Sequence, residues 1–383
     1  MQARAPQTQS SSARENTDQP SPQLQARSSG SLQALEGLLL GTAVGDALGL
    51  PLEGLSPLRA RRLFGDGPLS HRLLLGHGMV SDDTEHACMT AQALLAARGD
   101  PQRFARSLAW RLRLWFLGLP AGLGLATLRS ILRLWIGFSP AKSGVWSAGN
   151  GPAMRAPILG VCLGDDPEQM RAFVRASTRL THSDPRAYEG ALVVARAAYL
   201  SAHAPFTTRT GVEEDAVGQI LERLMGDVEG EELRANLTLV GTHLQKGSSP
   251  ATLAQELGLE SGVTGYINHT VPVAIFCWLR SPTNFRRALC DVIALGGDAD
   301  TTGAIAGALV GAATGPDSIP QEWRDGLLEW PRSRQWMHSL AMRLAENDDA
   351  GPLAIFWPGI IIRNALFTAT VLTHGFRRLF PPY

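Results

Sequence analysis

Residues 35–49 read LEGLLLGTAVGDALG and residues 303–315 read GAIAGALVGAATG, so each segment carries a glycine at every fourth position. On an α-helix this spacing makes a smooth stripe along one face, where a second backbone can approach closely. Each glycine inside a helix costs about 1 kcal/mol relative to alanine, so packing or function must offset that cost. We therefore expect two glycine-striped helices at the centre of the fold.

The same spacing also occurs in helices that associate within membranes. However, Glu36 and Asp46 interrupt the first segment, and Asp298 and Asp300 flank the second. Because charged side chains are expensive in lipid, we prefer the interpretation as core helices of a globular domain.

Most of the remaining sequence is predicted to be helical. Apolar residues recur at helical spacing over 104–117. Further helices are predicted over 168–180, 188–202, 216–225, 252–257 and 285–295. No run of alternating apolar and polar residues predicts a sheet. The predicted fold class is all-α, with one compact domain over residues 32–343.

The two ends of the chain differ from this domain. Residues 1–31 are polar and of low complexity, so we expect a disordered tail, and they lack the apolar core of a secretory signal peptide. Residues 344–383 form an apolar extension, interrupted by Pro358, Gly359 and Arg363. It is too broken for a membrane span of about 20 residues. A helix docked on the core is preferred over a membrane-surface element.

Composition limits the compartment and the partners. The chain has 383 residues, an apolar fraction of 44% and a formal net charge of zero. This balance gives no general attraction to nucleic acid, so no nucleic-acid partner is expected. The four cysteines are scattered without a CxxC pair, as in proteins of reducing compartments. We expect a cytoplasmic monomer.

Two acidic clusters lie far apart in the sequence. Residues 81–85 read SDDTE and residues 296–303 read GGDADTTG, and each cluster precedes a helix of small residues. Hard cations such as Mg²⁺ and Mn²⁺ prefer oxygen ligands of this kind. The alternative is that these residues only cap helices, because Asp and Ser are favoured at helix N-termini. Capping needs one aspartate per helix and each cluster has a second, which favours a site for one or two metal ions.

Other candidates carry weaker signals. Asp46 is expected to be structural, whereas Glu53, on a loop after Pro51, is narrowly favoured as a ligand over a solvated side chain. The loop Gly149-Asn150-Gly151 could present backbone N–H groups to phosphate, or be a simple turn. His182 could bond a substrate hydroxyl, although a lone histidine at a helix end is more often a cap or a surface residue. Tyr266 could stack on a base or belong to the core.

Five motifs taken in order resemble the ADP-ribosylglycohydrolase family, which includes the dinitrogenase reductase-activating glycohydrolase and the animal ADP-ribosyl-acceptor hydrolases. They read GTAVGDALGLPLE, SDDTE, GNGPAMR, THSDPRAYEGA and GGDADTTGAIAGALVG. Each motif alone is moderately specific, but their joint order is strongly specific. Two departures are Ser81, where the family often has threonine, and Pro152, which removes a backbone donor beside the glycine loop.

The resemblance implies an all-α enzyme that hydrolyses the bond between ADP-ribose and an acceptor on a protein or a small molecule. It implies two divalent ions, Mg²⁺ or Mn²⁺, with these ligands: Ser81, Asp82, Asp83, Asp298, Asp300 and Thr301. Catalytic roles would fall to Asp83, Asp300 and Glu53. Substrate-binding roles would fall to Gly149, Asn150, Gly151, His182 and Tyr266. A phosphoesterase that uses aspartate-bound metals, and a non-catalytic ADP-ribose-binding protein, remain as alternatives.

Overall fold

The computed structural model describes residues 1–2, 31–203, 214–346 and 351–381. The all-α prediction is confirmed, because the described residues form helices joined by loops, and their only β-type pairings are isolated bridges. Most of the predicted N-terminal tail, residues 3–30, lies outside the described residues.

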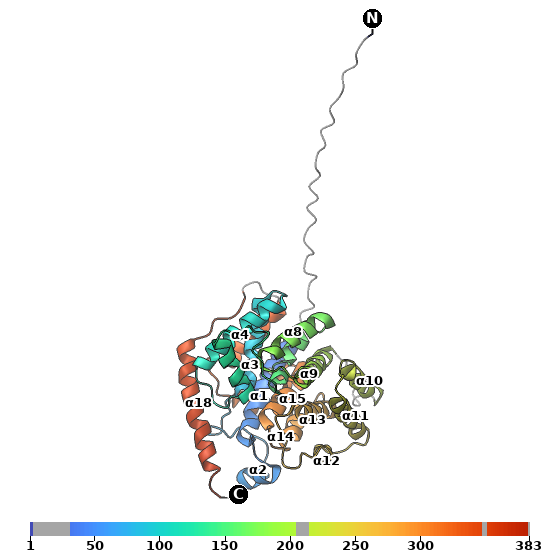
Figure 1. Cartoon of the computed structure of the whole chain (residues 1–383). Coiled ribbons are helices and arrows are strands. Elements are labelled where there is room, and N and C mark those ends of the chain that lie inside the picture. Colours follow the sequence, from blue (N-terminus) through green and yellow to red (C-terminus); the bar gives the residue numbers. More distant parts are fainter. Residues whose placement is uncertain (3–30, 204–213, 347–350, 382–383) are drawn as a thin grey trace.

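The two glycine-striped segments form α1 (Leu32–Gly49) and α15 (Ala299–Thr314), which lie at the centre of the molecule (Figure 1). A Cβ atom added at Gly41 would lie 2.2 Å from the carbonyl oxygen of Gly307, and one added at Gly45 would lie 2.1 Å from that of Gly303. Later glycines of α1 thus pair with earlier glycines of α15, so the two helices are antiparallel. The predicted close approach at the centre of the fold is confirmed.

The predicted helices are all present, with ends shifted by a few residues. Around the central pair, helices from both halves of the chain complete the domain (Figure 1). They are α2 (Pro57–Phe64), α3 (Asp82–Ala97), α4 (Pro101–Leu117), α5 (Leu125–Trp135), α6 (Gly151–Met154), α7 (Pro157–Leu163), α8 (Pro167–Thr181), α9 (Pro185–His203), α10 (Glu214–Met225), α11 (Glu231–Gln245), α12 (Pro250–Glu256), α13 (Ile267–Arg280), α14 (Phe285–Ile293), α16 (Gln321–Asp325), α17 (Arg334–Ala345) and the short 3₁₀ helices η1 (Leu50–Leu52) and η2 (Pro316–Ser318).

The apolar C-terminal stretch forms one long helix, α18 (Trp357–Arg377), along the outside of the molecule (Figure 1). Its inner face buries Gly359, Ile360 and Phe367. The buried guanidinium of Arg363 donates to the carbonyl oxygen of Val80 at 2.5 Å and to the Glu329 carboxylate at 2.6 Å. The extension is therefore held to the domain by both packing and hydrogen bonds.

Of the helices in the described part of the chain, the run Leu32–Leu52 alone is long and apolar enough to cross a membrane by length and composition. Within its most apolar window, 89% of the residues are buried inside the protein. This burial against α15 identifies it as a core helix.

Candidate acidic active site

The close pairing of α1 with α15 sets the distance between the two acidic clusters. Asp46, in α1, is fully buried, and its carboxylate accepts hydrogen bonds from the backbone N–H of Ser81 at 2.9 and 3.0 Å. It also accepts from the N–H and the hydroxyl of Thr84, at 3.2 and 2.6 Å. Burial raises the pKa of Asp46 to about 7, although these hydrogen bonds lower it. Asp46 thus fixes the start of α3, in agreement with the structural role expected for it.

The structure brings the SDDTE and GGDADTTG clusters together, although more than 200 residues separate them. The hydroxyl of Thr301, at the start of α15, donates to Asp83 Oδ2 at 3.2 Å, and the hydroxyl of Ser81 donates to the same oxygen at 3.1 Å. The other oxygen, Asp83 Oδ1, is buried and accepts no hydrogen bond from the described residues. A buried carboxylate oxygen without a donor is costly, which suits an atom intended for a cation or a substrate proton.

The carboxyl groups of the cluster are buried and close to one another, which disfavours their charged forms. Burial, followed by the neighbouring carboxylates, raises the pKa values of Asp82, Asp83 and Asp300 well above their usual range. Asp298 and Glu53 are among the neighbours that raise the pKa of Asp300. Carboxyl groups gathered in this way are destabilised in their charged form unless a cation lies among them.

The donor set fits a hard cation, with one qualification. In the described part of the chain, no three Asp, Glu, His or Cys side chains are already grouped as a metal site. Some of the carboxylate oxygens instead accept hydrogen bonds from nearby hydroxyl and amide groups. Asp83 Oδ2 accepts from the Thr301 hydroxyl, and Asp298 accepts from the Asn150 amide. Carboxylate and hydroxyl oxygens are the ligands that hard cations prefer, so the chemistry of this donor set fits such an ion.

Glu53 lies on the loop after η1, next to the second cluster. The backbone N–H of Gly54 donates to the Gly297 carbonyl at 2.7 Å, and Gly297 N–H donates to Leu55 at 2.8 Å. Gly297 has a φ of 72°, and a Cβ there would lie 2.0 Å from the carbonyl oxygen of Val263, so this approach requires glycine. Glu53 keeps access to solvent, yet partial burial and the Asp298 carboxylate raise its pKa.

The Gly149–Gly151 loop is joined to the second acidic cluster by Asn150. Its side-chain amide donates to Asp298 at 2.5 Å and to the Thr270 hydroxyl at 2.9 Å. Two backbone N–H groups of the loop already have protein acceptors, because Gly149 donates to Ser147 Oγ and Asn150 donates to the Gly265 carbonyl. The expectation that the loop presents several N–H groups to phosphate therefore narrows to the amide of Gly151, since Pro152 has none.

His182 lies against this loop and is buried, which excludes the surface alternative. Cβ atoms added at Gly149 and Gly151 would both lie 3.1 Å from its ring. His182 Nδ1 is 2.8 Å from the Thr181 hydroxyl, and burial lowers the pKa of His182 to about 3 with the help of Arg155. The ring is therefore neutral at physiological pH and able to act as a hydrogen-bond partner rather than as a cation.

Tyr266 is half-buried beside the same loop, with which it forms an isolated antiparallel bridge at Gly149. Its hydroxyl donates to Glu232 at 2.5 Å and accepts from Arg186 at 3.2 Å. The ring is thus held in place at the edge of the loop, where it is partly buried and packs against the core. This position is compatible with the expected stacking role.

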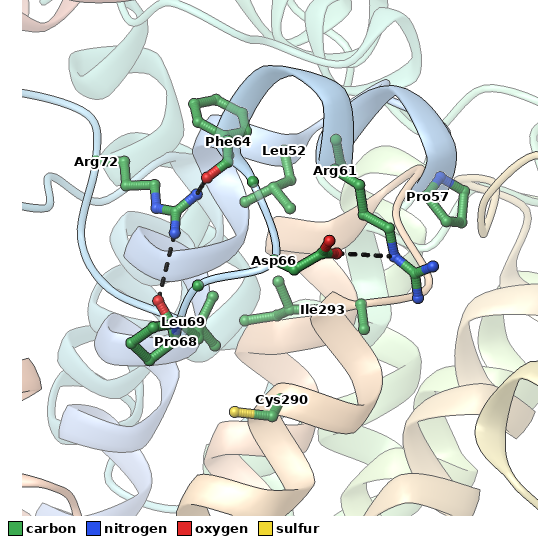
Figure 2. Close-up of a pocket in the computed structure, with 14 residues that line it drawn as sticks. Leu52, Pro57, Arg61, Phe64, Asp66, Pro68, Leu69, Arg72, Cys290 and Ile293 are labelled. Atoms are coloured by element: carbon green, nitrogen blue, oxygen red, sulfur yellow. Dashed lines mark hydrogen bonds and ion pairs between the residues drawn. The ribbon is translucent and has the colours of Figure 1, made fainter.

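A cavity of about 300 Å³ is lined by Leu52, by α2 and by α14, and by no residue of the two acidic clusters. Figure 2 shows its wall, formed by α2 residues such as Phe64 and by Cys290 and Ile293 of α14. Leu52 is the nearest lining residue to the site in sequence, and no predicted site residue lines the cavity. The acidic cluster, not this cavity, therefore remains the candidate functional site that the sequence predicted.

Sequence reasoning missed three buried or partly buried arginines that organise the site. Arg155 donates to the Gly151 carbonyl at 3.1 Å and to the Thr181 hydroxyl at 2.7 Å, so it holds both the loop and the partner of His182. Arg363 bonds the backbone just before Ser81. Arg378, after α18, donates to the carbonyl oxygens of Pro51 and Glu53, both at 2.8 Å. Arg155 stands within the quoted GNGPAMR motif, but no local pattern marks the other two.

In this helical domain, carboxylates therefore meet at the N-termini of α3 and α15, beside a glycine loop and a neutral histidine. The sequence profile of the ADP-ribosylglycohydrolase family matches residues 28–352. The chain belongs to this family. It is therefore a glycohydrolase enzyme that acts on ADP-ribosylated substrates.

Individual relatives agree with this assignment. The chain is 28% identical to the ADP-ribosyl-[dinitrogen reductase] glycohydrolase of Rhodospirillum rubrum over 75% of its length and 87% of that protein. It is 31% identical to the human ADP-ribosylhydrolase ARH3 over 49% of its length and 56% of that protein. A solved structure titled "ADP-ribosylglycohydrolase-related protein complex" superposes with a TM-score of 0.60 and 27% identity, covering 82% of this chain and 98% of that one.

Proposed function

We propose that the enzyme hydrolyses the glycosidic bond between the anomeric carbon of ADP-ribose and an acceptor, with two divalent ions, Mg²⁺ or Mn²⁺, at the acidic cluster. The observation that best supports this proposal is the hydrogen bond from the Thr301 hydroxyl to Asp83, because it shows that the two acidic clusters of the sequence lie next to each other. The proposed ligands are Ser81, Asp82, Asp83, Asp298, Asp300 and Thr301.

The chemistry needs charge stabilisation and a water nucleophile. Cleavage of a glycosidic bond passes through an oxocarbenium-like state, in which positive charge develops on the sugar ring. When bound, divalent ions supply Lewis acidity, which orients ribose hydroxyls and lowers the pKa of a water. The buried carboxylates lie where such positive charge would be stabilised most strongly, since the local dielectric constant is low.

Particular residues have particular tasks in this proposal. Asp83 Oδ1, which has no donor among the described residues, accepts the proton of the attacking water, and Asp300 is the second candidate for this base. Glu53 approaches the reacting centre from the solvent side. The Gly149–Gly151 loop faces the diphosphate, with neutral His182 bonding a ribose hydroxyl and Tyr266 offering a stacking surface to the adenine.

The chemical identity of the acceptor can be tested with two kinds of ADP-ribosylated peptide. Purified enzyme would be incubated with arginine-linked and serine-linked ADP-ribosyl peptides, in Mg²⁺, Mn²⁺ or EDTA, and released ADP-ribose would be measured. We expect metal-dependent release from one peptide class. Asp82→Ala, Asp83→Ala, Asp298→Ala and Asp300→Ala should each abolish turnover with the helical circular dichroism intact.

Two other outcomes would redirect the assignment. Cleavage of ADP-ribose at its phosphates, to AMP and ribose 5-phosphate or to ADP and ribose, in place of release of intact ADP-ribose from a peptide, would indicate a phosphoesterase. Binding of ADP-ribose with no release from any tested conjugate would indicate a non-catalytic binding protein. Full activity in EDTA would contradict the role of the metal ions while leaving the hydrolase class intact.

A further inference from the structure

The outer face of α18 is more apolar than the solvent-facing side of a surface helix usually is. A surface helix normally buries its apolar face and exposes its polar one. In α18 the inner face holds Arg363 and Asn364, which are both buried and hydrogen-bonded to the domain. The outer face is apolar, and five of its large side chains are at least 46% exposed: Ile361, Ile362, Leu366, Leu372 and Phe376. Phe380, just beyond the end of the helix, is 50% exposed.

These exposed side chains form a continuous stripe. They recur at helical spacing along α18 and its C-terminal end, with Ala365 and Ala369 exposed between them. The helix lies on the outside of the molecule along most of one side (Figure 1). Contiguous apolar patches of this length are uncommon on soluble monomers and usually mark an interaction surface.

Charge distinguishes the possible occupants of this surface. α18 contains no Asp or Glu, and Arg377 is exposed at its C-terminal end. The neighbouring α2 (Pro57–Phe64) has three arginines and no acid. Arg59 donates a hydrogen bond of 2.5 Å to the carbonyl oxygen of Arg378, the residue after α18. One exposed acid lies close by, because Asp66 is 3.8 Å from the Arg61 guanidinium. The patch therefore ends in a basic cluster, although the whole chain has a net charge of zero.

We propose that the outer face of α18 docks on an anionic lipid surface, with the apolar stripe at the level of the acyl chains and the α2–Arg377 cluster among the headgroups. A second copy of this chain is a poorer fit. In a two-fold pair, the basic end of one α18 would meet the N-terminal end of the other, which offers Phe356 and Trp357 but no acid. This inference concerns a partner surface and does not depend on the acidic site.

The test is co-sedimentation of the full chain with phosphatidylglycerol–phosphatidylcholine vesicles, compared with phosphatidylcholine vesicles alone. Wild-type protein should bind the anionic vesicles, and high salt should weaken the binding. Ala365→Glu combined with Ala369→Glu should remove it, because it places two carboxylates in the apolar stripe. The matched control is Ala235→Glu with Ala251→Glu, which makes the same changes at exposed alanines of α11 and α12. Arg61→Gln and Arg377→Gln should each weaken binding about five-fold.

Circular dichroism, and release of ADP-ribose from the peptide conjugates in detergent-free buffer, would confirm that both double variants fold. Absence of vesicle binding by the wild-type chain would overturn the proposal. Equal binding by the two double variants would also overturn it. So would a wild-type dimer in light scattering that Ala365→Glu/Ala369→Glu dissociates while vesicle binding is absent, since that result would assign the face to a second copy.

Discussion

Gly41→Ala is the most direct probe of the central helix pair. The added methyl would lie 2.2 Å from the carbonyl oxygen of Gly307 and 2.9 Å from its carbonyl carbon. Both are backbone atoms, so no side-chain rotation can relieve the clash. Normal contact requires the two helices to separate by roughly 1 Å, which would reduce dispersion contacts along the whole interface.

The magnitude follows from two opposing effects. Overpacking of a core typically costs about 1–3 kcal/mol, and a clash with backbone belongs at the upper end of that range. Alanine recovers at most about 1 kcal/mol through its higher helix propensity. We therefore expect Gly41→Ala to lower the free energy of unfolding by about 2 kcal/mol.

Urea denaturation followed by circular dichroism would measure this change, with Gly218→Ala as the control. Gly218 also lies within a helix, α10, but nothing is within 4 Å of a Cβ added there. That variant should gain up to about 1 kcal/mol, so the two substitutions should have opposite signs. If Gly41→Ala were neutral or stabilising, the argument for obligatory glycine contacts between α1 and α15 would be wrong.

Three further predictions concern the site and its support. The pKa of Asp46 is about 7 in the folded protein against an ordinary 3.8, so the folded state binds this proton more tightly than the unfolded state does. The stability of metal-free protein should therefore fall as pH rises from about 4 to about 7, and the pKa of Asp83 shifts in the same direction. Thermal melts would measure this fall, and added Mg²⁺ should restore stability at pH 7. Arg378→Gln should lower kcat about ten-fold by releasing the Glu53 loop, and an unchanged kcat in steady-state assays would remove Arg378 from the account. Arg363→Met should cost about 3–5 kcal/mol in urea denaturation because it strands the buried Glu329 carboxylate, and adding Glu329→Gln should recover part of that loss; equal stability of the single and double variants would contradict this explanation.

The fold was accessible from sequence where local pattern and packing agree. The glycine stripes of α1 and α15 predicted a close central pair because only glycine permits that distance. The helical periodicity of α4 and α8 predicted the ends of these helices to within three residues. The chemistry of the two acidic clusters was also visible, since two carboxylates at one helix start exceed what capping needs. No local pattern in the sequence shows that the two clusters lie close together in space, because their distance depends on the antiparallel register of α1 and α15.

The residues that sequence reasoning missed act through tertiary contacts. Arg378 lies more than 300 residues from the loop that it holds, and Arg363 is buried on the inner face of a helix whose outer face is apolar. A periodicity argument assigns the charged residue of such a helix to solvent, which is wrong here. The glycines of the Gly149–Gly151 loop predicted several backbone amides available to phosphate. In the structure, the amides of Gly149 and Asn150 already donate to protein acceptors, which leaves that of Gly151.

The central claim is that ADP-ribose is released at the buried acidic cluster with the help of divalent ions. The most direct measurement is single-turnover release of ADP-ribose from arginine-linked and serine-linked peptides by wild-type enzyme and Asp300→Asn, with Mg²⁺ and with EDTA. We expect release by the wild-type enzyme with Mg²⁺ but not with EDTA, and no release by the variant under either condition. Undiminished release by Asp300→Asn, or by wild-type enzyme in EDTA, would contradict it.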